Sequence, residues 1–389
     1  MVTTTSCFAQ VLGMVNRGKF ECAVRDWKAE KGAKGMTSWD QFVGMAFCQM
    51  ASADSLREIE GGLATALGKL RHLGLKKAPP RSSLSYANAH RPWQMYETVF
   101  TQILGQCQDV ATTRGKKFKF KNALVSLDAS VIDLCLKTFD WAKFRRTKGA
   151  IKLHLMLNHR GYLPCWALAT EGKTHEIQAA RLLHFDEGTI VVMDRGYNDY
   201  RLFARWTLEK VFFVTRLKDN AVYEVVERRA VLEGGKIRSD ETIRLTGAKA
   251  EEHCPHLLRR IVVWDEENER EIVLLTNIFH LAASTVAEIY KERWQIELFF
   301  KALKQNLKVK TFVGTSENAV KTQIWTALIA ILLLKFMQLK STFGWSLSNL
   351  AAMLRFNLLT YRDLWAWLND PANTPVEEPG IRQLPIWAG

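Results

Sequence analysis

The feature that most constrains this chain is an alternation of extended and helical segments between residues 122 and 217. The extended segments are short, apolar and rich in branched side chains, which is typical of buried strands. They predict strands at 122–128, 131–139, 150–158, 162–170, 189–194 and 211–217, with helices at 176–184 and 195–210. Strands interleaved with helices in this order favour an α/β domain with a partly parallel sheet.

Two aspartates close strands of this series. Asp128 ends the first predicted strand, and Asp194 ends the strand at 189–194. Three strands, a helix, a strand ending in an acid and a late helix is the element order of a ribonuclease H-like domain, in which these two strands lie side by side. Two carboxylates that converge there repel each other unless a cation lies between them. Mg²⁺ accepts such oxygen ligands, and two ions can hold the attacking and leaving oxygens of a displacement at phosphorus.

A third acid, Glu297, lies in a predicted long helix that begins near Ser284 or Thr285 and continues to Lys304. A helix turns by about 100° per residue. Four side chains, a tyrosine, an arginine, the acid and a lysine, would therefore lie on one face of this helix, within an arc of roughly 60°. These residues are Tyr290, Arg293, Glu297 and Lys304. A carboxylate between cations suits metal and phosphate binding. Considered alone, the pattern favours an ordinary solvated face with salt bridges.

The charge of the chain points to a polyanionic partner. Lysine and arginine total 54 against 40 acidic residues, which gives a net charge of +14. Nucleic acid is the commonest such partner, although ribosome-associated and membrane-surface proteins have similar compositions. The seven cysteines form no CxxC pair, which disfavours a zinc site or a disulfide framework and favours a reducing cytoplasm.

The hydropathy of the sequence does not indicate a membrane protein. The first twenty residues lack the pattern of a signal peptide. The longest apolar run, 324–334, is too short to span a bilayer and predicts a buried core helix.

The first 110 or so residues read as short helices, two of them opened by capping boxes at Ser38 and Ser55. In a helix candidate before Pro92, Ser85, Asn88 and Arg91 recur at every third position. They could share an exposed face that enters a DNA groove, or form a solvated face of an ordinary bundle. A basic turn between strands, with Arg145, Arg146 and Lys148, is a further candidate for contact with the DNA backbone.

We predict an α/β fold: a ribonuclease H-like catalytic domain interrupted by a β-rich insertion, with an all-α N-terminal DNA-binding domain and a helical C-terminal tail. The predicted boundaries are 1–115 for the helical DNA-binding domain, 116–217 and 278–340 for the two parts of the catalytic domain, 218–277 for the insertion and 341–389 for the tail.

Three motifs resemble one family. The segment from Tyr290 to Lys304 matches, residue for residue, the Tyr-two-Arg-three-Glu-six-Lys motif of insertion-sequence transposases of the DDE type, in the insertion sequence four group. The contexts Ser-Leu-Asp128-Ala-Ser and Val-Met-Asp194-Arg-Gly-Tyr are similar to the family's two aspartate strands, and TFVGTSENAVKTQIW also resembles the family. The similarity covers roughly residues 120 to 340, and more weakly the N-terminal helices.

The resemblance implies metal-dependent cutting at transposon ends followed by strand transfer into target DNA. Asp128, Asp194 and Glu297 would hold two Mg²⁺ or Mn²⁺ ions, and Tyr290, Arg293 and Lys304 would contact phosphates, with Lys301 as a further backbone contact. In relatives the second strand is cut through a DNA hairpin with a flipped base. Trp294 sits where a stacking residue would hold that base, although a tryptophan on an amphipathic helix is equally a core residue.

The resemblance also implies a homodimer on transposon-end and target DNA, no membrane association, and a place in the bacterial cytoplasm at the nucleoid. Two rivals stay open: a transposase-derived DNA-binding protein that no longer catalyses, and a metal-dependent nuclease without strand transfer. The remaining acids near the motifs could support the metal ligands from behind, but solvated or salt-bridged positions are expected: Asp133, Asp140, Asp199, Glu288 and Glu292. His154 and His175 could approach the site, but structural roles are expected for both.

Overall fold

The computed structural model describes residues 5–66, 70–112, 118–135, 138–139, 141–145, 148–247, 249–309 and 311–377. The chain forms two compact units. The helical unit comprises Met1–Thr113 and Lys301–Gly389, and the sheet unit comprises Arg114–Phe300. The predicted boundaries, which assign residues 278–340 to the catalytic domain, stay a prediction; in the structure the residues from Lys301 onward group with the helical unit.

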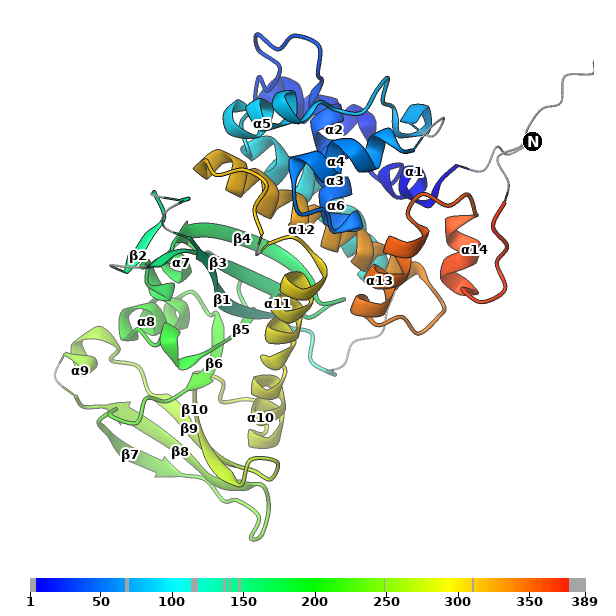
Figure 1. The fold of residues 1–389 in the computed structure, drawn as a ribbon. Helices are drawn as coiled ribbons and strands as arrows, with labels where there is room; N and C mark the ends of the chain where they lie inside the picture. The colour runs from blue at the N-terminus through cyan, green and yellow to red at the C-terminus, as the bar shows by residue number, and fades with distance from the viewer. Residues whose placement is uncertain are drawn as a thin grey trace, which may run out of the picture. The chain divides into compact units, whose positions relative to one another are not determined.

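The helical unit is built around one apolar helix, α12 (Glu317–Lys340). Around it lie α1 (Cys7–Leu12), α2 (Arg17–Asp26), α3 (Ser38–Ala51), α4 (Leu56–Ala64), α5 (Arg81–His90), α6 (Gln94–Thr112), α13 (Leu347–Asn357) and α14 (Leu364–Asn369), with a 3-10 turn at Leu70–Leu73 (Figure 1). Helix α12 packs against α3, α5, α6 and α13. A helix that is apolar on every side must be buried, and α12 is buried almost without interruption from Ala319 to Leu334.

By length and composition α12 could cross a membrane, but 83% of its most apolar 18-residue window is buried inside the structure. The expectation of a buried core helix is confirmed, with longer bounds than the apolar run suggested.

The N-terminal caps of two helices follow from short polar side chains. Ser55 caps α4, as expected, and accepts a hydrogen bond from the backbone N–H of Glu58 at 3.2 Å. The capping box of α3 was predicted one residue too late. Thr37 is its cap, paired reciprocally with Asp40, and Ser38 is already the first helical residue.

The sheet unit contains a ten-stranded sheet in the order β2-β3-β1-β5-β6-β10-β9-β8-β7, with β4 paired to β3. Its strands are β1 (Leu124–Leu134), β2 (Lys143–Arg145), β3 (Lys148–Asn158), β4 (Leu163–Glu171), β5 (Ile190–Met193), β6 (Phe212–Arg216), β7 (Tyr223–Arg228), β8 (Ile237–Leu245), β9 (Leu258–Asp265) and β10 (Arg270–Thr276). Its helices are α7 (Glu176–Arg181), α8 (Tyr200–Leu208), α9 (Ala250–His253), α10 (Ala283–Lys291) and the start of α11 (Trp294–Asn306), with a 3-10 turn at Arg195–Tyr197.

The two strands predicted at 122–128 and 131–139 are one strand, β1. It pairs antiparallel with β3 without a break, from Val125 opposite Asn158 to Leu134 opposite Gly149. The separation was wrong because Ala129 and Ser130 were read as a turn, although neither residue breaks a strand.

Helices cover both faces of the central strands. Alternate residues of a strand point to opposite faces. Val191 and Met193 of β5 therefore share a core with Phe203 and Trp206 of α8. Ile190 and Val192 join a second core, which includes Val286 and Ile289 of α10. Burial on both faces explains why β5 is apolar at every position.

The β-rich segment at 218–277 continues the same sheet. Strand β10 pairs antiparallel with β6, with Leu275 opposite Thr215, and β9, β8 and β7 follow in antiparallel order (Figure 1). A buried ion pair joins two of these strands. Arg259 donates to both carboxylate oxygens of Asp240, at 2.8 and 2.6 Å, and also to the backbone oxygens of Ile278 and Leu281.

Removing one partner of this pair leaves a buried charge uncompensated. We expect Asp240→Ala to lower the free energy of unfolding of the sheet unit by about 3–5 kcal/mol. Glu266→Ala removes the exposed partner of Lys236, 2.7 Å away, and is expected to cost at most about 1 kcal/mol. Urea unfolding of both variants checks this, and equal midpoints would contradict it.

Candidate catalytic site

Asp128 and Asp194 stand at the same level on neighbouring strands. Strands β1 and β5 run parallel, and their pairing ends with Leu127 opposite Met193, so that each aspartate is the next residue of its strand. Asp194 follows the last residue of β5, as expected. Asp128 is not at a strand end, because β1 continues beyond it beside β3.

Arg293 connects Asp128 with Glu297. Its Nη1 lies 3.6 Å from Asp128 Oδ2, and its Nη2 lies 2.5 Å from Glu297 Oε1. The three side chains are only 17%, 19% and 34% exposed, in the order Arg293, Asp128 and Glu297. Positions 128 and 297 are 169 residues apart in the chain, yet one guanidinium contacts both carboxylates.

Burial raises the pKa of the Asp128 carboxyl to about 6. The backbone N–H of Ala129, 2.8 Å from Oδ1, and the charge of Arg293 oppose this rise, while the charges of Glu297 and Asp194 add to it. The charges of both other acids thus act on Asp128. A carboxyl in such surroundings is costly to ionise unless more positive charge is supplied.

The donor set suits a hard divalent cation, because it consists of carboxylate oxygens. Within the residues that the structure describes, no three acidic, histidine or cysteine side chains are grouped closely enough to hold a metal ion. In this arrangement the guanidinium of Arg293 supplies the positive charge between Asp128 and Glu297. An ion shared by these acids therefore requires Arg293 to shift.

The single long helix predicted to reach Lys304 is wrong. Helix α10 ends at Lys291, and α11 begins at Trp294. Across the break the N–H groups of Arg293 and Ile296 bond to carbonyls three residues earlier, which tightens the turn. Tyr290 therefore does not share a helix with Glu297; it is largely buried in a core cluster, with its ring centroid 5.9 Å from Arg293 Cζ.

Trp294, Lys301 and Lys304 are exposed to solvent to different degrees. Trp294 is 55% exposed, so the alternative of a core tryptophan is wrong. Lys301 is exposed and Lys304 is half-buried, on the part of α11 that belongs to the helical unit.

The exposed face predicted for Ser85, Asn88 and Arg91 is wrong for two of its three members. Asn88 is 1% exposed and accepts a hydrogen bond from Gln41 at 2.8 Å. Arg91 is buried as well and donates to the backbone oxygen of Thr37 at 2.8 Å. Only Ser85 is exposed. The physical reason is that a three-residue polar repeat also serves to satisfy groups between packed helices.

The predicted basic turn falls at β2 and the start of β3. Arg146 lies outside the described residues, as do the side chains of Arg145 and Lys148. His154 is buried in β3 and lies 3.0 Å from the hydroxyl of Thr170, as expected of a structural histidine.

Sequence reasoning missed the cations that follow the second aspartate. A groove of about 490 Å³ is lined by Arg195, Gly196, Lys218, Asp219 and Asn220. Arg195 directly follows Asp194 and pairs with Asp219 at 3.2 Å on the surface. The signal was present in the sequence as a basic residue beside the acid.

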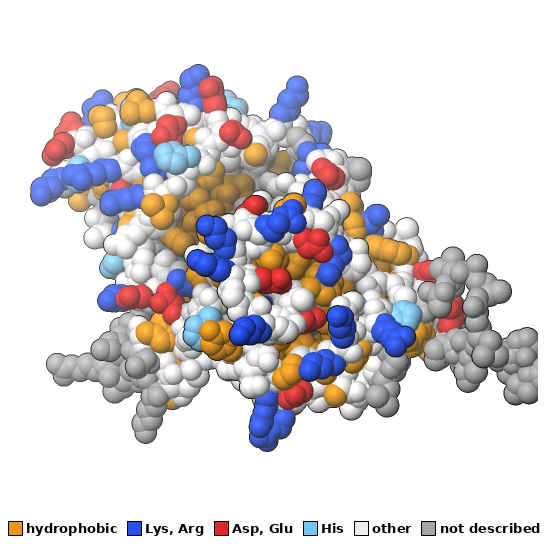
Figure 2. Space-filling view, turned by 90° about the horizontal axis from the view of Figure 1, so that it is seen from above, with side chains coloured by type: hydrophobic (Ala, Val, Ile, Leu, Met, Phe, Trp, Pro, Cys, Tyr) orange, Lys and Arg blue, Asp and Glu red, His pale blue; other side chains and the backbone are white. Residues whose placement is uncertain are grey.

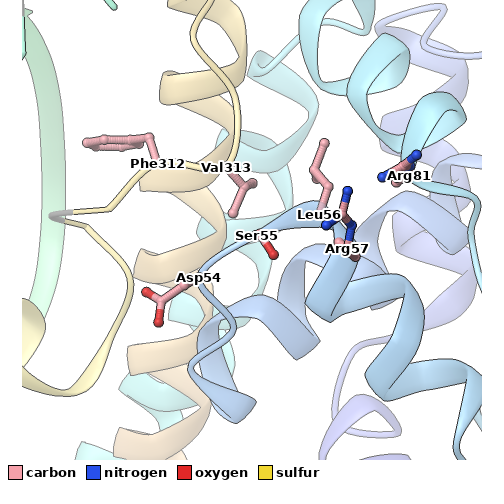
Figure 3. Close-up of a pocket in the computed structure, with 7 residues that line it drawn as sticks. All are labelled: Asp54, Ser55, Leu56, Arg57, Arg81, Phe312 and Val313. Carbon is pink, nitrogen blue, oxygen red and sulfur yellow. The ribbon is translucent and has the colours of Figure 1, made fainter.

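A second pocket, of about 390 Å³, lies within the helical unit (Figure 3). Arg57 of α4 and Arg81 of α5 line it together with Phe312 and Val313. Asp54, at its edge, pairs with Lys308 at 2.6 Å. Arg57 carried no motif in the sequence and was also missed.

The raised pKa of Asp128 gives a pH-dependent stability. The folded state holds this proton more tightly than the unfolded chain, so ionisation costs stability as the pH rises through about 6. Without divalent metal at pH 8, we expect Asp128→Asn to unfold at a higher temperature than the wild type, by the equivalent of roughly 1–3 kcal/mol. The difference should shrink as the pH falls from 7 toward 4. Calorimetric scans across this range check it, and a lower melting temperature for the variant at pH 8 would refute it.

Comparison with known proteins shows the family of this chain. Residues 119–333 match the family model described as a transposase DDE domain, and residues 3–76 match a domain of unknown function. The chain is 32% identical over 262 residues to y4zB of Sinorhizobium fredii, described as a transposase, covering 66% of this chain and 71% of that protein. It is 28% identical over 278 residues to a protein of Geobacillus stearothermophilus described as the transposase of insertion sequence element IS5377, covering 71% and 72%.

A third relative, described as a transposase of element IS4SA from Synechocystis, is 33% identical over 166 residues, which cover 41% of this chain and 44% of the relative. Among solved structures, a piggyBac transposase in a synaptic complex with hairpin DNA matches with a TM-score of 0.49 and 8% identity, over 90% of this chain and 80% of that one. The family model spans more than half of the chain and includes both aspartates and Glu297. The chain therefore belongs to the DDE-domain transposases, and its relatives are transposases of insertion sequences.

Proposed function

We propose that this transposase cuts DNA at the ends of its insertion sequence and joins the freed ends to target DNA, with Asp128, Asp194 and Glu297 as the catalytic acids. One observation supports this most. A single guanidinium contacts Asp128 and Glu297, while Asp194 stands beside Asp128 on the next strand. Acids from three distant segments of the chain thus lie near one guanidinium and one pair of strands, and charged clusters of this kind are common at functional sites.

Enzymes of this family use divalent metal ions, and we propose two Mg²⁺ or Mn²⁺ ions here, held by Asp128, Asp194 and Glu297. When bound, the ions would stabilise charge on the phosphoryl group and activate the attacking oxygen. The chain's own contribution is to hold Asp128 and Glu297 on either side of Arg293 in a mostly buried setting, where electrostatic interactions are strong.

The reaction that we propose is one displacement at phosphorus, used twice. Water attacks a phosphodiester at the end of the element and releases a 3′-hydroxyl. That hydroxyl then attacks a phosphodiester of the target and displaces another 3′-oxygen, so that the number of phosphodiester bonds is conserved in the joining step. Both displacements need the same acids and the same positive charge around the phosphate.

In this scheme Arg293 changes its partners when metal and DNA bind. In the protein alone it neutralises Asp128 and Glu297, and with metal and DNA it would turn to a phosphate near the scissile bond. We propose Tyr290, Lys304 and Lys301 as further contacts to the DNA backbone. Arg145, Arg146, Lys148 and Ser85 are proposed as peripheral DNA contacts, whereas the buried Asn88 and Arg91 are not.

The net charge of +14 supports binding along a DNA backbone. On the face seen in Figure 2, lysine and arginine side chains are spread among acidic ones and do not form one block.

The exposure of Trp294 supports a role in holding a flipped base during a hairpin step. Its indole is open to solvent and immediately follows Arg293 in the chain. An aromatic face offers a base about 1–3 kcal/mol of stacking, comparable with the cost of unstacking it from the duplex.

We propose a ribonuclease H-like core for the sheet unit. Its support is the strand order β4-β3-β1-β5-β6, with antiparallel pairing on one side of β1 and parallel pairing on the other. Residues 218–277 would be the insertion in this core. We further propose that the N-terminal helices bind the element's ends, that two copies pair these ends as a homodimer, and that the enzyme works on chromosomal DNA in the bacterial cytoplasm.

The direct test is Glu297→Gln, which keeps the shape of the side chain and removes its charge. Using duplexes that carry the DNA flanking the coding region, we expect cutting with Mg²⁺ to fall by roughly a thousand-fold or more, as for removal of a catalytic group. Binding of the same duplexes should be nearly unchanged. Glu288→Gln, an exposed acid on α10, is the matched control and should cut normally. Equal cutting by the wild type and Glu297→Gln would refute the proposal.

Product analysis on labelled end DNA separates the rivals. A transposase gives joined products, a nuclease gives cutting alone, and a silent DNA-binding protein gives neither.

A separate test addresses Trp294. We expect Trp294→Ala to slow the second-strand step by roughly 10- to 100-fold, because stacking of the flipped base is lost. Nicking of the first strand should continue, and Trp294→Phe should restore most of the rate. A uniform loss in both steps would show that Trp294 has a different role.

A further inference from the structure

A buried polar cluster lies behind the proposed catalytic acids, within the sheet unit. It consists of Ser126 of β1, His159 after β3, Tyr162 of the following turn and Glu292 between α10 and α11. The resemblance to the family gave none of these residues a role. Glu292 was expected to be solvated or salt-bridged, with a place behind the metal ligands as the alternative; its side chain is only 6% exposed, so it is not solvated.

The contacts in this cluster form a chain. Ser126 Oγ lies 2.7 Å from His159 Nε2. On the other side of the ring, Nδ1 lies 3.6 Å from Glu292 Oε2. The hydroxyl of Tyr162 donates to the same carboxylate oxygen at 3.0 Å. Burial and the neighbouring charge of Glu292 raise the pKa of Tyr162 to about 12, so its hydroxyl keeps the proton that it donates.

Each end of the cluster is next to a residue of the proposed catalytic site. Ser126 precedes Asp128 by two positions in a strand, so both side chains leave the same face of the sheet. Glu292 precedes Arg293 directly, at the break between α10 and α11. The buried carboxylate of Glu292 accepts a hydrogen bond from Tyr162 and lies beside the His159 ring, so these contacts connect the break to the turn after β3.

Ser126, His159 and Glu292 also have the order of a nucleophile, base and acid. The burial of Ser126 excludes that use, because it is 0% exposed and no substrate phosphate can reach its oxygen. The cluster is suited to holding its neighbours in position.

We propose that Ser126, His159, Tyr162 and Glu292 are positioning residues, which lock the α10–α11 break to strand β1 and so set the separation between Asp128 and the pair Arg293–Glu297. This inference rests on the proposed function of those acids. If the cluster is loosened, α11 can shift. The three acids then bind divalent metal more weakly, although every ligand is still present. Groups that hydrogen-bond to metal ligands and orient them typically raise metal affinity or activity 10- to 100-fold.

The test measures Mn²⁺ binding by calorimetry on the full-length, DNA-free protein, together with Mg²⁺-dependent cutting of end DNA. The variants are Glu292→Ala, His159→Gln and Tyr162→Phe. We expect Glu292→Ala and His159→Gln to weaken Mn²⁺ binding by about 10-fold or more and to slow cutting similarly, with end-DNA affinity within about two-fold of the wild type. Tyr162→Phe, which removes one hydrogen bond, should have a smaller effect, and Glu292→Gln should recover part of the loss because it still accepts from Tyr162.

Two controls separate positioning from general loss of structure. Glu288→Ala removes an exposed acid four residues earlier and should leave Mn²⁺ binding unchanged. His154→Gln removes a buried histidine of β3 that bonds Thr170 outside the cluster, and it should lower the melting temperature without changing the Mn²⁺ affinity of the folded protein. If Glu292→Ala and His159→Gln lower only the melting temperature, as His154→Gln does, the inference is overturned.

The outcome also distinguishes this inference from the proposed function. If Glu297→Gln loses Mn²⁺ binding and cutting while Glu292→Ala keeps both, only the positioning role fails. If Glu297→Gln keeps both, the proposed function itself fails.

Discussion

The positive charge of Arg293, set between the carboxylates of Asp128 and Glu297, is the interaction on which the candidate site depends. Burial makes the ionised form of Asp128 costly, and Glu297 and Asp194 add repulsion. The guanidinium offsets this cost in the protein alone. We propose that such a site accepts a divalent cation once the guanidinium of Arg293 turns away.

The sheet makes that gathering possible. Parallel pairing of β1 with β5 brings Asp128 level with Asp194, although positions 128 and 194 are 66 residues apart in the chain. The two cores on either face of β5 hold α8 and α10 against the sheet, and the break after α10 directs Arg293 and Glu297 toward Asp128. Buried strands thus fix two acids, and a buried turn residue, Glu292, fixes the approach of the third.

The sequence alone predicted the parts of this arrangement that depend on local pattern. The apolar strand before Asp194 and the buried helix that became α12 were visible as uninterrupted apolar runs. The break between α10 and α11 was not visible, because Lys291, Glu292 and Arg293 are all acceptable helix residues, and the contacts of Glu292 with Tyr162 and His159 are tertiary. Asn88 and Arg91 were misjudged for a related reason: a polar residue that satisfies a buried group has the same spacing as one that faces solvent. The continuation of the sheet through β10 was equally hidden, since pairing with β6 leaves no local signal.

The central claim is that Asp128, Asp194 and Glu297 share divalent metal. The most direct measurement is anomalous diffraction from crystals of the enzyme with end DNA and Mn²⁺, collected at the manganese edge. The account predicts anomalous peaks within coordination distance of all three carboxylates, with the Arg293 guanidinium displaced from between Asp128 and Glu297. Peaks confined to other residues, with Arg293 still bridging these two acids, would contradict it.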